Sequence, residues 1–382
     1  MFNLVSLAFA FTVLPGIHAA NVLKSSFTSS LVAKISDSLS STDDSNPDVS
    51  ASNAALKVVV PVQAGNGQTF NDVLVDTGSS VLWVGAQTRY EPGSNSQQGN
   101  LTGFSIGYGA GGASGLAYYD KVTIGSATVN SQIIGASNST SGFTLVSPID
   151  GILGLGPSGS NGGEITGFNA TPTFVESLVS EGSIDEPVFG IYVNGLDSTS
   201  GSQIGEGEIT FGGVDDSKID GELTWVPQNT PYNVHWEFNV TSMKWGTQNL
   251  VNESTPARTD TGVLEIGLPS DAYFDILQSF PGATLVTNGT FLGYMAFPSN
   301  ATVSALPSLT WTIGSQDFEI TPDKYLIPQG LYSSLNLTKG GVQYSWIISA
   351  GFGSYMFGQK WLESFYTAYD MQNHQVGVAR LA

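Results

Sequence analysis

Short runs of apolar residues, several alternating with polar ones, recur along most of the chain and predict β-strands. The clearest runs are residues 57–62, 72–75, 121–124, 132–134, 188–193 and 208–211. Clusters of Gly, Asn and Ser separate them at the spacing typical of all-β proteins. Helical periodicity is scarce, and its best cases are residues 173–181 and 271–278. The pattern therefore predicts an all-β fold.

A weak internal repeat divides this β pattern into two halves. Val-Asp-Thr-Gly-Ser at 75–79 is echoed by Thr-Asp-Thr-Gly-Val at 259–263. Each copy is followed downstream by two apolar residues and a glycine, at 152–154 and 356–358. A repeat of this length predicts two homologous lobes, each bringing one aspartate to a shared central cleft.

The chain length agrees with this division, because 382 residues exceed what one compact core usually holds. We expect an N-terminal lobe at 51–225 and a C-terminal lobe at 226–382. Residues 21–50 are rich in Ser, Asp and Asn and predict a flexible or propeptide segment. Residues 1–20 contain a short apolar run and a small-residue end, which predict a secretory signal peptide.

Composition narrows the classes of function. The formal net charge of −20 argues against binding to nucleic acid or to an anionic membrane. The chain has no cysteine, which excludes disulfides and thiolate chemistry. Eight Asn-x-Ser/Thr sites and the predicted leader favour a secreted, extracellular glycoprotein over a cytosolic one. The sites are Asn100, Asn138, Asn169, Asn239, Asn252, Asn288, Asn300 and Asn336.

The paired Asp-Thr-Gly loops carry the candidate chemistry, centred on Asp76 and Asp260. Two neighbouring carboxylates cannot both ionise cheaply, so one keeps its proton while the other is charged. The charged one can activate a water for attack on a peptide carbonyl, and the protonated one can donate a proton. A single Asp-Thr-Gly would indicate only a turn, whereas two copies in matching contexts favour this catalytic interpretation.

Residues 76–83, Asp-Thr-Gly-Ser-Ser-Val-Leu-Trp, resemble the first active-site motif of the pepsin-like aspartic protease family. The resemblance extends from about residue 55 to the C-terminus and is greatest to the fungal polyporopepsin branch. It implies a bilobal pepsin-like fold that hydrolyses internal peptide bonds at acidic pH, without cofactor or metal. It also implies protein or peptide substrates, synthesis as a zymogen and a monomeric state.

The same resemblance assigns expected roles to individual residues. Asp76 and Asp260 are the expected catalytic pair, and Tyr108 with Gly109 is the expected flap over the substrate. Gly78 and Gly262 are expected beside the substrate. The expected supporting residues are Thr77, Ser79, Trp83 and Thr261. Two alternatives stay open for Lys34 in the candidate propeptide. It is either a cation that reaches the dyad and pairs with it, or a residue of a disordered spacer.

The second loop departs from the family pattern at several positions. Arg258 precedes it where the family has an apolar residue, and Val263 replaces the usual hydroxyl residue. Leu264 and Glu265 are also atypical. Loss of a hydrogen-bond donor should raise the apparent pKa of the dyad, so we expect an altered pH optimum or reduced turnover. The alternative is a secreted, non-catalytic protein-binding pseudoprotease on the same fold.

Two other motifs compete with this interpretation. Residues 103–107 fit Gly-x-Ser-x-Gly, and His235 or His374 could complete a hydrolase triad. The glycines at 109, 111 and 112 cannot start the helix that this motif requires, so we interpret it as coincidence. Residues 154–159 fit Gly-x-Gly-x-x-Gly without a following helix, and we interpret them as a turn.

Overall fold

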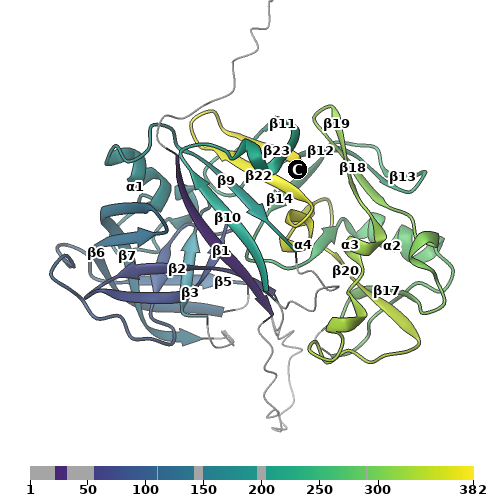
Figure 1. Cartoon of the computed structure of the whole chain (residues 1–382), viewed down its shortest axis with the longest axis horizontal. Coiled ribbons are helices and arrows are strands. Elements are labelled where there is room, and N and C mark those ends of the chain that lie inside the picture. The colour runs from purple at the N-terminus through teal and green to yellow at the C-terminus, as the bar shows by residue number, and fades with distance from the viewer. Residues whose placement is uncertain (1–21, 32–55, 110, 142–148, 196–203, 290) are drawn as a thin grey trace, which may run out of the picture.

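The computed structural model describes residues 22–31, 56–109, 111–141, 149–195, 204–289 and 291–382. Among these residues, the strands form two sheets, which lie on opposite sides of the molecule and meet at its centre (Figure 1). The prediction of an all-β, bilobal fold is confirmed. No helix in the described ranges is long and apolar enough to cross a membrane.

The first sheet has 13 strands among the described residues. Their spatial order is β11 (Ile219–Pro227), β23 (Gln375–Leu381), β22 (Phe365–Asp370), β9 (Val188–Val193), β10 (Ile204–Phe211), β1 (Leu23–Leu31), β2 (Leu56–Ala64), β3 (Gln68–Asp76), β8 (Gly151–Gly154), β4 (Leu82–Val84), β7 (Ala127–Ser141), β6 (Gly111–Ile124) and β5 (Phe104–Tyr108). Strands β22 and β23 come from the end of the chain, so this sheet joins both halves of the sequence. The predicted lobe boundary at residue 225 falls within β11.

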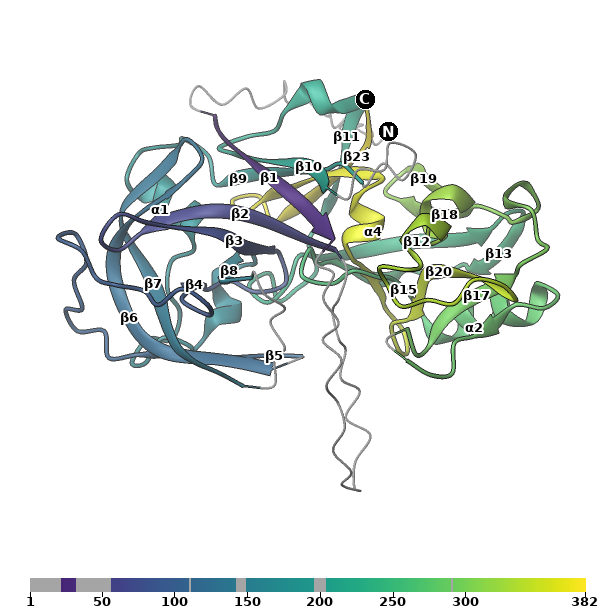
Figure 2. The same ribbon diagram turned by 60° about the horizontal axis from the view of Figure 1, so that its bottom comes forward.

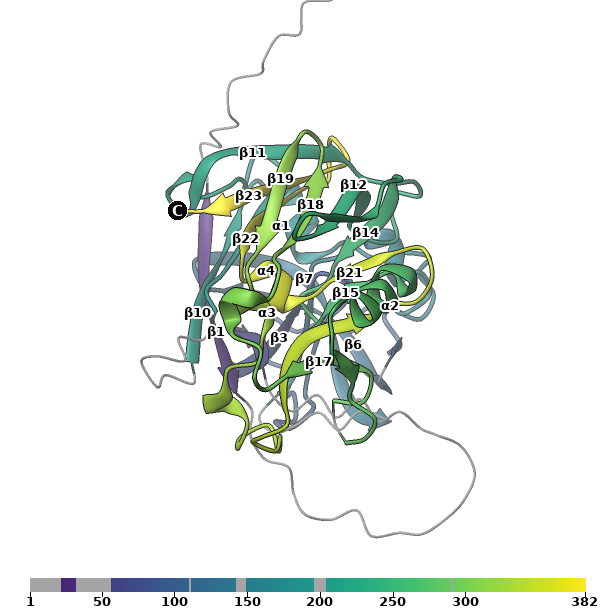
Figure 3. The ribbon, with the colours of Figure 1, turned by 90° about the vertical axis from the view of Figure 1, so that its right-hand side faces the viewer.

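The second sheet has ten strands in the described part of the chain. Their order is β16 (Thr284–Leu285), β17 (Tyr294–Pro298), β20 (Val342–Ser349), β15 (Ile266–Leu268), β21 (Tyr355–Phe357), β14 (Thr255–Thr259), β12 (Glu237–Trp245), β18 (Leu309–Ile313) and β19 (Gln316–Ile320), with β13 (Gln248–Val251) paired to β12. Figure 3 views this sheet from its outer side, with β17 and α2 (Ser270–Ser279) toward the viewer.

The predicted elements correspond closely to the observed ones. The six predicted runs lie in β2, β3, β6, β7, β9 and β10. Of the two helical ones, 271–278 lies in α2, and 173–181 covers α1 (Phe174–Ser180) with one capping residue at each end. Thr173 is the N-cap of α1. Its side chain accepts a hydrogen bond from the Glu176 N–H, while the Glu176 side chain accepts one from the Thr173 N–H. This capping box satisfies helix-end donors and explains where α1 starts. The remaining short helices are α3 (Pro322–Tyr325), α4 (Gln359–Leu362), η1 (Ser158–Asn161), η2 (Asp216–Lys218), η3 (Val303–Ala305) and η4 (Gln329–Leu331).

The internal repeat appears as the same strand arrangement in both sheets. β3 runs parallel to β8, with Asp76 opposite Gly154, and β14 runs parallel to β21, with Thr259 opposite Phe357. In each case a third strand, β4 or β15, returns antiparallel along the same partner. The glycines are required by close packing, because a Cβ at Gly154 would lie 2.5 Å from the backbone nitrogen of Val81.

Part of the segment expected to be flexible or propeptide is a strand. β1 lies between β2 and β10 and pairs antiparallel with both (Figure 2). Residues 32–50 of that segment, including Lys34, lie outside the described residues, as does the predicted signal peptide. The described part is therefore built into the sheet.

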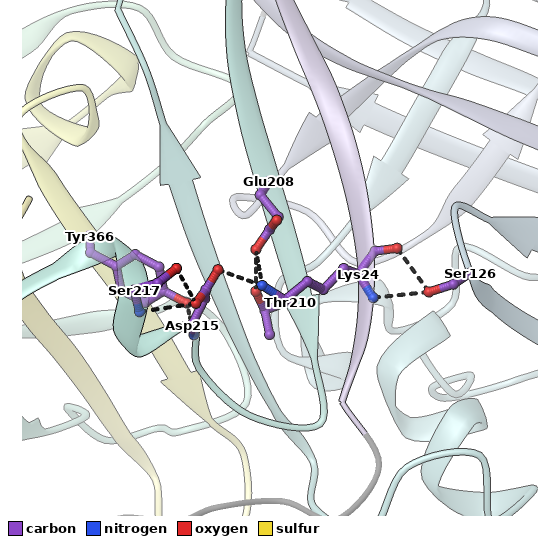
Figure 4. A network of polar contacts seen from close by, with 7 residues as sticks. All are labelled: Lys24, Ser126, Glu208, Thr210, Asp215, Ser217 and Tyr366. Atoms are coloured by element: carbon purple, nitrogen blue, oxygen red, sulfur yellow. Dashed lines mark hydrogen bonds and ion pairs between the residues drawn. The ribbon is translucent and has the colours of Figure 1, made fainter. Parts of the chain in front are cut away.

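Lys24 fastens the start of β1 to the neighbouring segments (Figure 4). Its Nζ forms an ion pair with Glu208 at 3.0 Å and another with Asp215. Its backbone N–H donates to the Ser126 Oγ at 3.0 Å. Burial alone would raise the pKa of Asp215, but hydrogen bonds from Lys24 and Ser217 outweigh burial and hold that pKa below its usual range.

We expect Lys24→Met to lower the free energy of unfolding by about 0.5–1 kcal/mol at pH 6, the size of a partly exposed ion pair. Because the pKa of Asp215 is lowered in the folded state, its contribution exists above the unfolded pKa near 4 and is lost as pH falls further. Urea unfolding of both proteins at pH 6 and pH 3 measures this. An equal difference at the two pH values would contradict the ion-pair account.

Candidate active site

The two Asp-Thr-Gly loops meet where the sheets meet, because each follows a central strand of its own sheet. Asp76 ends β3, and Asp260 directly follows β14. The backbone N–H of Asp260 donates to the Phe357 carbonyl at 3.0 Å, and the Leu155 N–H donates to the Asp76 carbonyl at 2.7 Å. The repeated strand arrangement therefore fixes both aspartates at equivalent positions.

Reciprocal hydrogen bonds between the two threonines lock the loops together. The Thr77 N–H donates to the Thr261 Oγ1 at 3.0 Å, and the Thr261 N–H donates to the Thr77 Oγ1 at 3.0 Å. Each hydroxyl donates onward to the opposite strand, from Thr261 to the Val75 carbonyl at 2.7 Å and from Thr77 to the Thr259 carbonyl at 3.3 Å. Both threonines are buried, so all of these polar groups are satisfied within the protein.

Each aspartate also accepts a hydrogen bond inside its own loop. The Gly78 N–H donates to Asp76 Oδ1 at 2.8 Å, and the Gly262 N–H donates to Asp260 Oδ1 at 2.9 Å. The glycines allow the opposite carboxylate to approach, because a Cβ on Gly78 would lie 2.4 Å from Asp260 Oδ2. A Cβ on Gly262 would lie 2.7 Å from Asp76 Oδ1. Each glycine therefore touches the carboxylate of the other loop.

The two carboxyl groups influence each other strongly. Desolvation of the Asp260 carboxyl, followed by the charge of Asp76 and a hydrogen bond with it, raises the pKa of Asp260 well above its usual range. The Gly262 N–H and the charge of Arg258 oppose this rise but do not cancel it. Such a pair can hold one proton between two carboxyls over a wide range of acidic pH.

Asp76 also belongs to a chain of hydrogen bonds that runs through Ser79 to the flap hairpin. The Ser79 hydroxyl donates to Asp76 Oδ2, and Tyr108 is hydrogen-bonded to Ser79. The indole N–H of buried Trp83 donates to the Tyr108 hydroxyl at 2.7 Å. The structure thus brings Ser79, Trp83 and Tyr108 together around Asp76. Gly109 is exposed at the end of β5, next to residue 110, which lies outside the described residues.

The second loop has Val263 at the position equivalent to Ser79, so the Asp260 carboxyl has no hydroxyl donor from that position. The atypical Glu265 accepts a hydrogen bond from the Tyr294 hydroxyl and one from the Leu264 N–H at 3.1 Å, which offsets the cost of partly burying a carboxylate. Its carboxylate is therefore paired within the C-terminal half.

We expect Val263→Ser to shift the pH profile of activity toward acid by about one unit. A serine hydroxyl at this position would donate to the charged form of the Asp260 carboxyl and lower the apparent pKa of the pair. The pH dependence of kcat/KM measures the shift, with Val263→Ala as the control that changes volume without adding a donor. A profile that moves equally in both variants would contradict this explanation.

One further group near the flap was not anticipated from the sequence. Burial raises the pKa of Glu164 to about 7, and its charge acts on Tyr108. Glu164 lies beside β5 because its carbonyl accepts a hydrogen bond from the Ser105 N–H at 2.8 Å. No sequence motif marks this residue, since its place depends on a loop that returns to β5.

The competing motifs have structural explanations. Residues 103–107 lie in and before β5, which continues as a hairpin into β6 and not into a helix. His374 occupies a turn with φ of 50° and stacks on Tyr232, with ring centroids 4.3 Å apart. Among the described residues, no cluster of three or more His, Asp or Glu side chains could hold a metal ion.

Two lobes joined by a shared sheet, with an Asp-Thr-Gly loop from each lobe at the junction, are the architecture of pepsin-like aspartic proteases. The chain belongs to the eukaryotic aspartyl protease family, whose sequence profile matches residues 59–381. It is therefore an aspartic endopeptidase.

Known relatives agree with this assignment. The chain is 33% identical to polyporopepsin of Irpex lacteus over 87% of its own length and 96% of that protein. It is 32% identical to mouse gastricsin, over 80% of this chain and 76% of that protein. The crystal structure of the aspartic proteinase from Irpex lacteus superposes with a TM-score of 0.78 at 29% identity, covering 94% of this chain and 98% of that one. The predicted resemblance to the fungal polyporopepsin branch is confirmed, and the pseudoprotease alternative is not favoured.

Proposed function

We propose that Asp76 and Asp260 together catalyse the hydrolysis of internal peptide bonds in acid. The observation that carries this proposal is the pair of reciprocal Thr77–Thr261 hydrogen bonds, which hold the two carboxyls face to face. A catalytic dyad requires this fixed, close arrangement, since positioning contributes much of the rate acceleration.

In this mechanism the carboxyls have different roles at the start of the reaction. Asp76 accepts hydrogen bonds from Gly78 and Ser79, which stabilise a carboxylate that can take a proton from water. The raised pKa of Asp260 supports its role as the protonated partner that donates to the carbonyl oxygen. As Asp76 takes its proton, the water attacks the peptide carbon and forms a tetrahedral species. Asp76 then gives that proton to the nitrogen, the carbon–nitrogen bond breaks to release the amine, and Asp260 recovers a proton from a hydroxyl of the tetrahedral species.

Tyr108 is the proposed flap residue, with Gly109 at the turn beyond it. Its hydroxyl, held by Trp83 and linked through Ser79 to Asp76, places the tip of β5 near the dyad. We propose that the substrate binds as an extended peptide under this hairpin, with Gly78 and Gly262 beside its backbone. Protein or peptide substrates follow from this arrangement, and a monomer supplies every proposed residue.

We further propose that the protein is secreted as a glycosylated zymogen. The apolar run at 4–14 supports a leader. The asparagines of all eight predicted glycosylation sites are exposed, which supports glycan attachment. The lobes at 51–225 and 226–382, and a propeptide within 21–50, complete the proposed organisation. Mass analysis of protein recovered from culture medium, before and after deglycosylation, tests these processing steps.

A direct assay tests the catalytic proposal. Purified protein is incubated with a denatured protein substrate from pH 2 to pH 7, with and without pepstatin. We expect cleavage in acid that pepstatin abolishes. A stably folded protein that cleaves nothing across this range would overturn the proposal.

A further inference from the structure

Two basic residues, Arg258 on one face of the second sheet and His235 just before β12, lie near the dyad in the sequence of the sheet strands. Strands β12, β14 and β21 are neighbours, with Arg258 opposite Glu237 on one side and opposite Met356 on the other. Burial alternates along these strands: Trp236, Ala257 and Phe357 are buried, whereas Glu237, Arg258 and Met356 are partly exposed. Residues opposite one another share a face of the sheet, so the latter three line its open face.

The open face continues directly to the dyad. Asp260 follows Arg258 by two residues, and the backbone keeps strand-like pairing, since the Thr259 N–H donates to the Trp236 carbonyl at 3.2 Å. His235 lies just before the neighbouring strand β12, two residues ahead of Glu237. Because this pairing continues past the start of β12 at the end of β14, the two-residue alternation of burial also continues, and it puts His235 and Asp260 on the same side as Arg258. His235 and Arg258 are called the cationic pair below.

The cationic pair and the carboxyls of the dyad influence one another's ionisation. Burial and the charge of Arg258 lower the pKa of His235, while the charges of Glu237 and Asp76 oppose that change. The charge of Arg258 also acts on Asp260. Both basic residues therefore act electrostatically on the dyad or on each other.

The Arg258 guanidinium is not neutralised by an ion pair within the described part of the chain. Its Nε–H donates to the thioether sulfur of Met356 at 3.3 Å, and no described carboxylate lies within ion-pair distance. Glu237 is on the same face, but its Oε1 accepts a hydrogen bond from the Asn229 side-chain amide at 3.2 Å. A planar guanidinium with free N–H groups suits a carboxylate, which it can bind with two hydrogen bonds.

We propose that the cationic pair forms a specificity site for an acidic substrate side chain, Asp or Glu, at one of the two positions that flank the scissile bond. This inference rests on the proposed catalytic role of the dyad. Arg258 binds the carboxylate, Met356 packs against its aliphatic stem, and His235 adds a second donor in acid. The enzyme therefore prefers a substrate with an acidic residue at this position. An enzyme with apolar side chains in place of Arg258 and His235 would prefer a substrate with an apolar residue there.

The preference has a defined pH dependence. A glutamate side chain in a peptide ionises near pH 4.3, so its charge, and the advantage it gives, is lost below that value. The guanidinium stays charged throughout. His235 has a lowered pKa and becomes cationic only at more acidic pH than an ordinary histidine. We expect the greatest preference near pH 5.

The test compares peptides that differ only by Glu or Gln, placed before the scissile bond in one pair and after it in another. For the wild-type enzyme at pH 5, kcat/KM should be about tenfold higher for Glu at one of the two positions, a typical value for a hydrogen-bonded charge. Arg258→Met should reduce this ratio to near one, and Arg258→Lys should retain part of it. Glu237→Gln should increase it.

Controls separate this inference from other roles of Arg258. Lys244→Met removes a charge at a distant position of β12, where Lys244 pairs with Asp317 at 3.5 Å, and should leave the ratio unchanged. If Arg258 only tuned the dyad, its replacement would change kcat/KM equally for the Glu and the Gln peptide. A Glu-to-Gln ratio that is the same in Arg258→Met as in the wild type would therefore overturn the inference. It would also be overturned if the wild-type enzyme cleaved the Glu and Gln peptides equally well at both positions.

A binding experiment keeps the inference separate from the proposed catalysis. Non-cleavable reduced-amide analogues of the same Glu and Gln peptides are titrated into the wild-type protein and into Arg258→Met by calorimetry. If no peptide is cleaved, the catalytic proposal fails, but tighter binding of the Glu analogue, lost in Arg258→Met, still supports the specificity site. Equal affinities would overturn it.

Discussion

Asp76→Asn should lower kcat/KM for peptide hydrolysis by about 10²–10⁴-fold, the usual contribution of a positioned general base or acid. The amide keeps the shape of the carboxyl, because its oxygen can accept from the Gly78 N–H and its NH2 group can donate to the Ser79 hydroxyl, but it cannot take a proton from water. It also removes the negative charge that raises the pKa of Asp260. The loss should therefore fall on kcat, with little change in the affinity for a substrate-like inhibitor.

Steady-state kinetics at the pH optimum measures this loss, and circular dichroism checks that the fold is kept. Asp275→Asn, which changes an exposed carboxyl on α2, is the matched control and should keep full activity. Asp260→Asn should be as damaging, and the double variant should be hardly worse than either single one, because the carboxyls act as a unit. Activity within tenfold of wild type in Asp76→Asn would contradict the proposed mechanism.

Thr261→Val should destabilise the protein by about 2–4 kcal/mol, because it leaves two buried backbone groups without partners. The Thr77 N–H loses its acceptor, and the Val75 carbonyl loses its donor. Valine keeps the shape of threonine, so the effect isolates the lost hydrogen bonds from any change in volume. Activity should fall as well, since the loops that carry the aspartates are no longer locked together.

Urea unfolding measures the stability difference. Thr284→Val is the control, because Thr284 is exposed and its hydroxyl makes a single long hydrogen bond of 3.4 Å. Thr77→Val should behave like Thr261→Val, and the double variant should be less destabilised than the sum, because the two residues share one network. A Thr261→Val protein as stable as Thr284→Val would show that the threonine network contributes little.

The β elements and the strand arrangement around the dyad were predictable because they depend on local patterns. Alternating apolar residues mark strands whatever their partners are, and the two Asp-Thr-Gly copies with their downstream glycines indicate equivalent surroundings. The contact between Thr77 and Thr261 follows from that equivalence, although they lie 184 residues apart.

Other features depend on which strands become neighbours, and this information is not local. The pairing of Lys24 with Glu208 and Asp215 requires β1 to lie beside β10, and nothing in the Ser-rich composition of residues 21–50 indicates that. Similarly, Arg258 could be recognised as unusual, but its relation to His235 requires the register of β12 and β14. In the sequence, His235 was considered only as a possible member of a hydrolase triad, and nothing there linked it to Arg258.

β1 is hydrogen-bonded along both of its edges, to β2 and to β10, and contributes no residue to the dyad. A single cut anywhere between residues 31 and 56 would therefore change its status from a part of the chain to a bound peptide. Its retention would then depend on concentration, and dilution would favour its loss. Its departure would leave two facing rows of unpaired backbone groups in the middle of a sheet, an opening that another extended segment could fill.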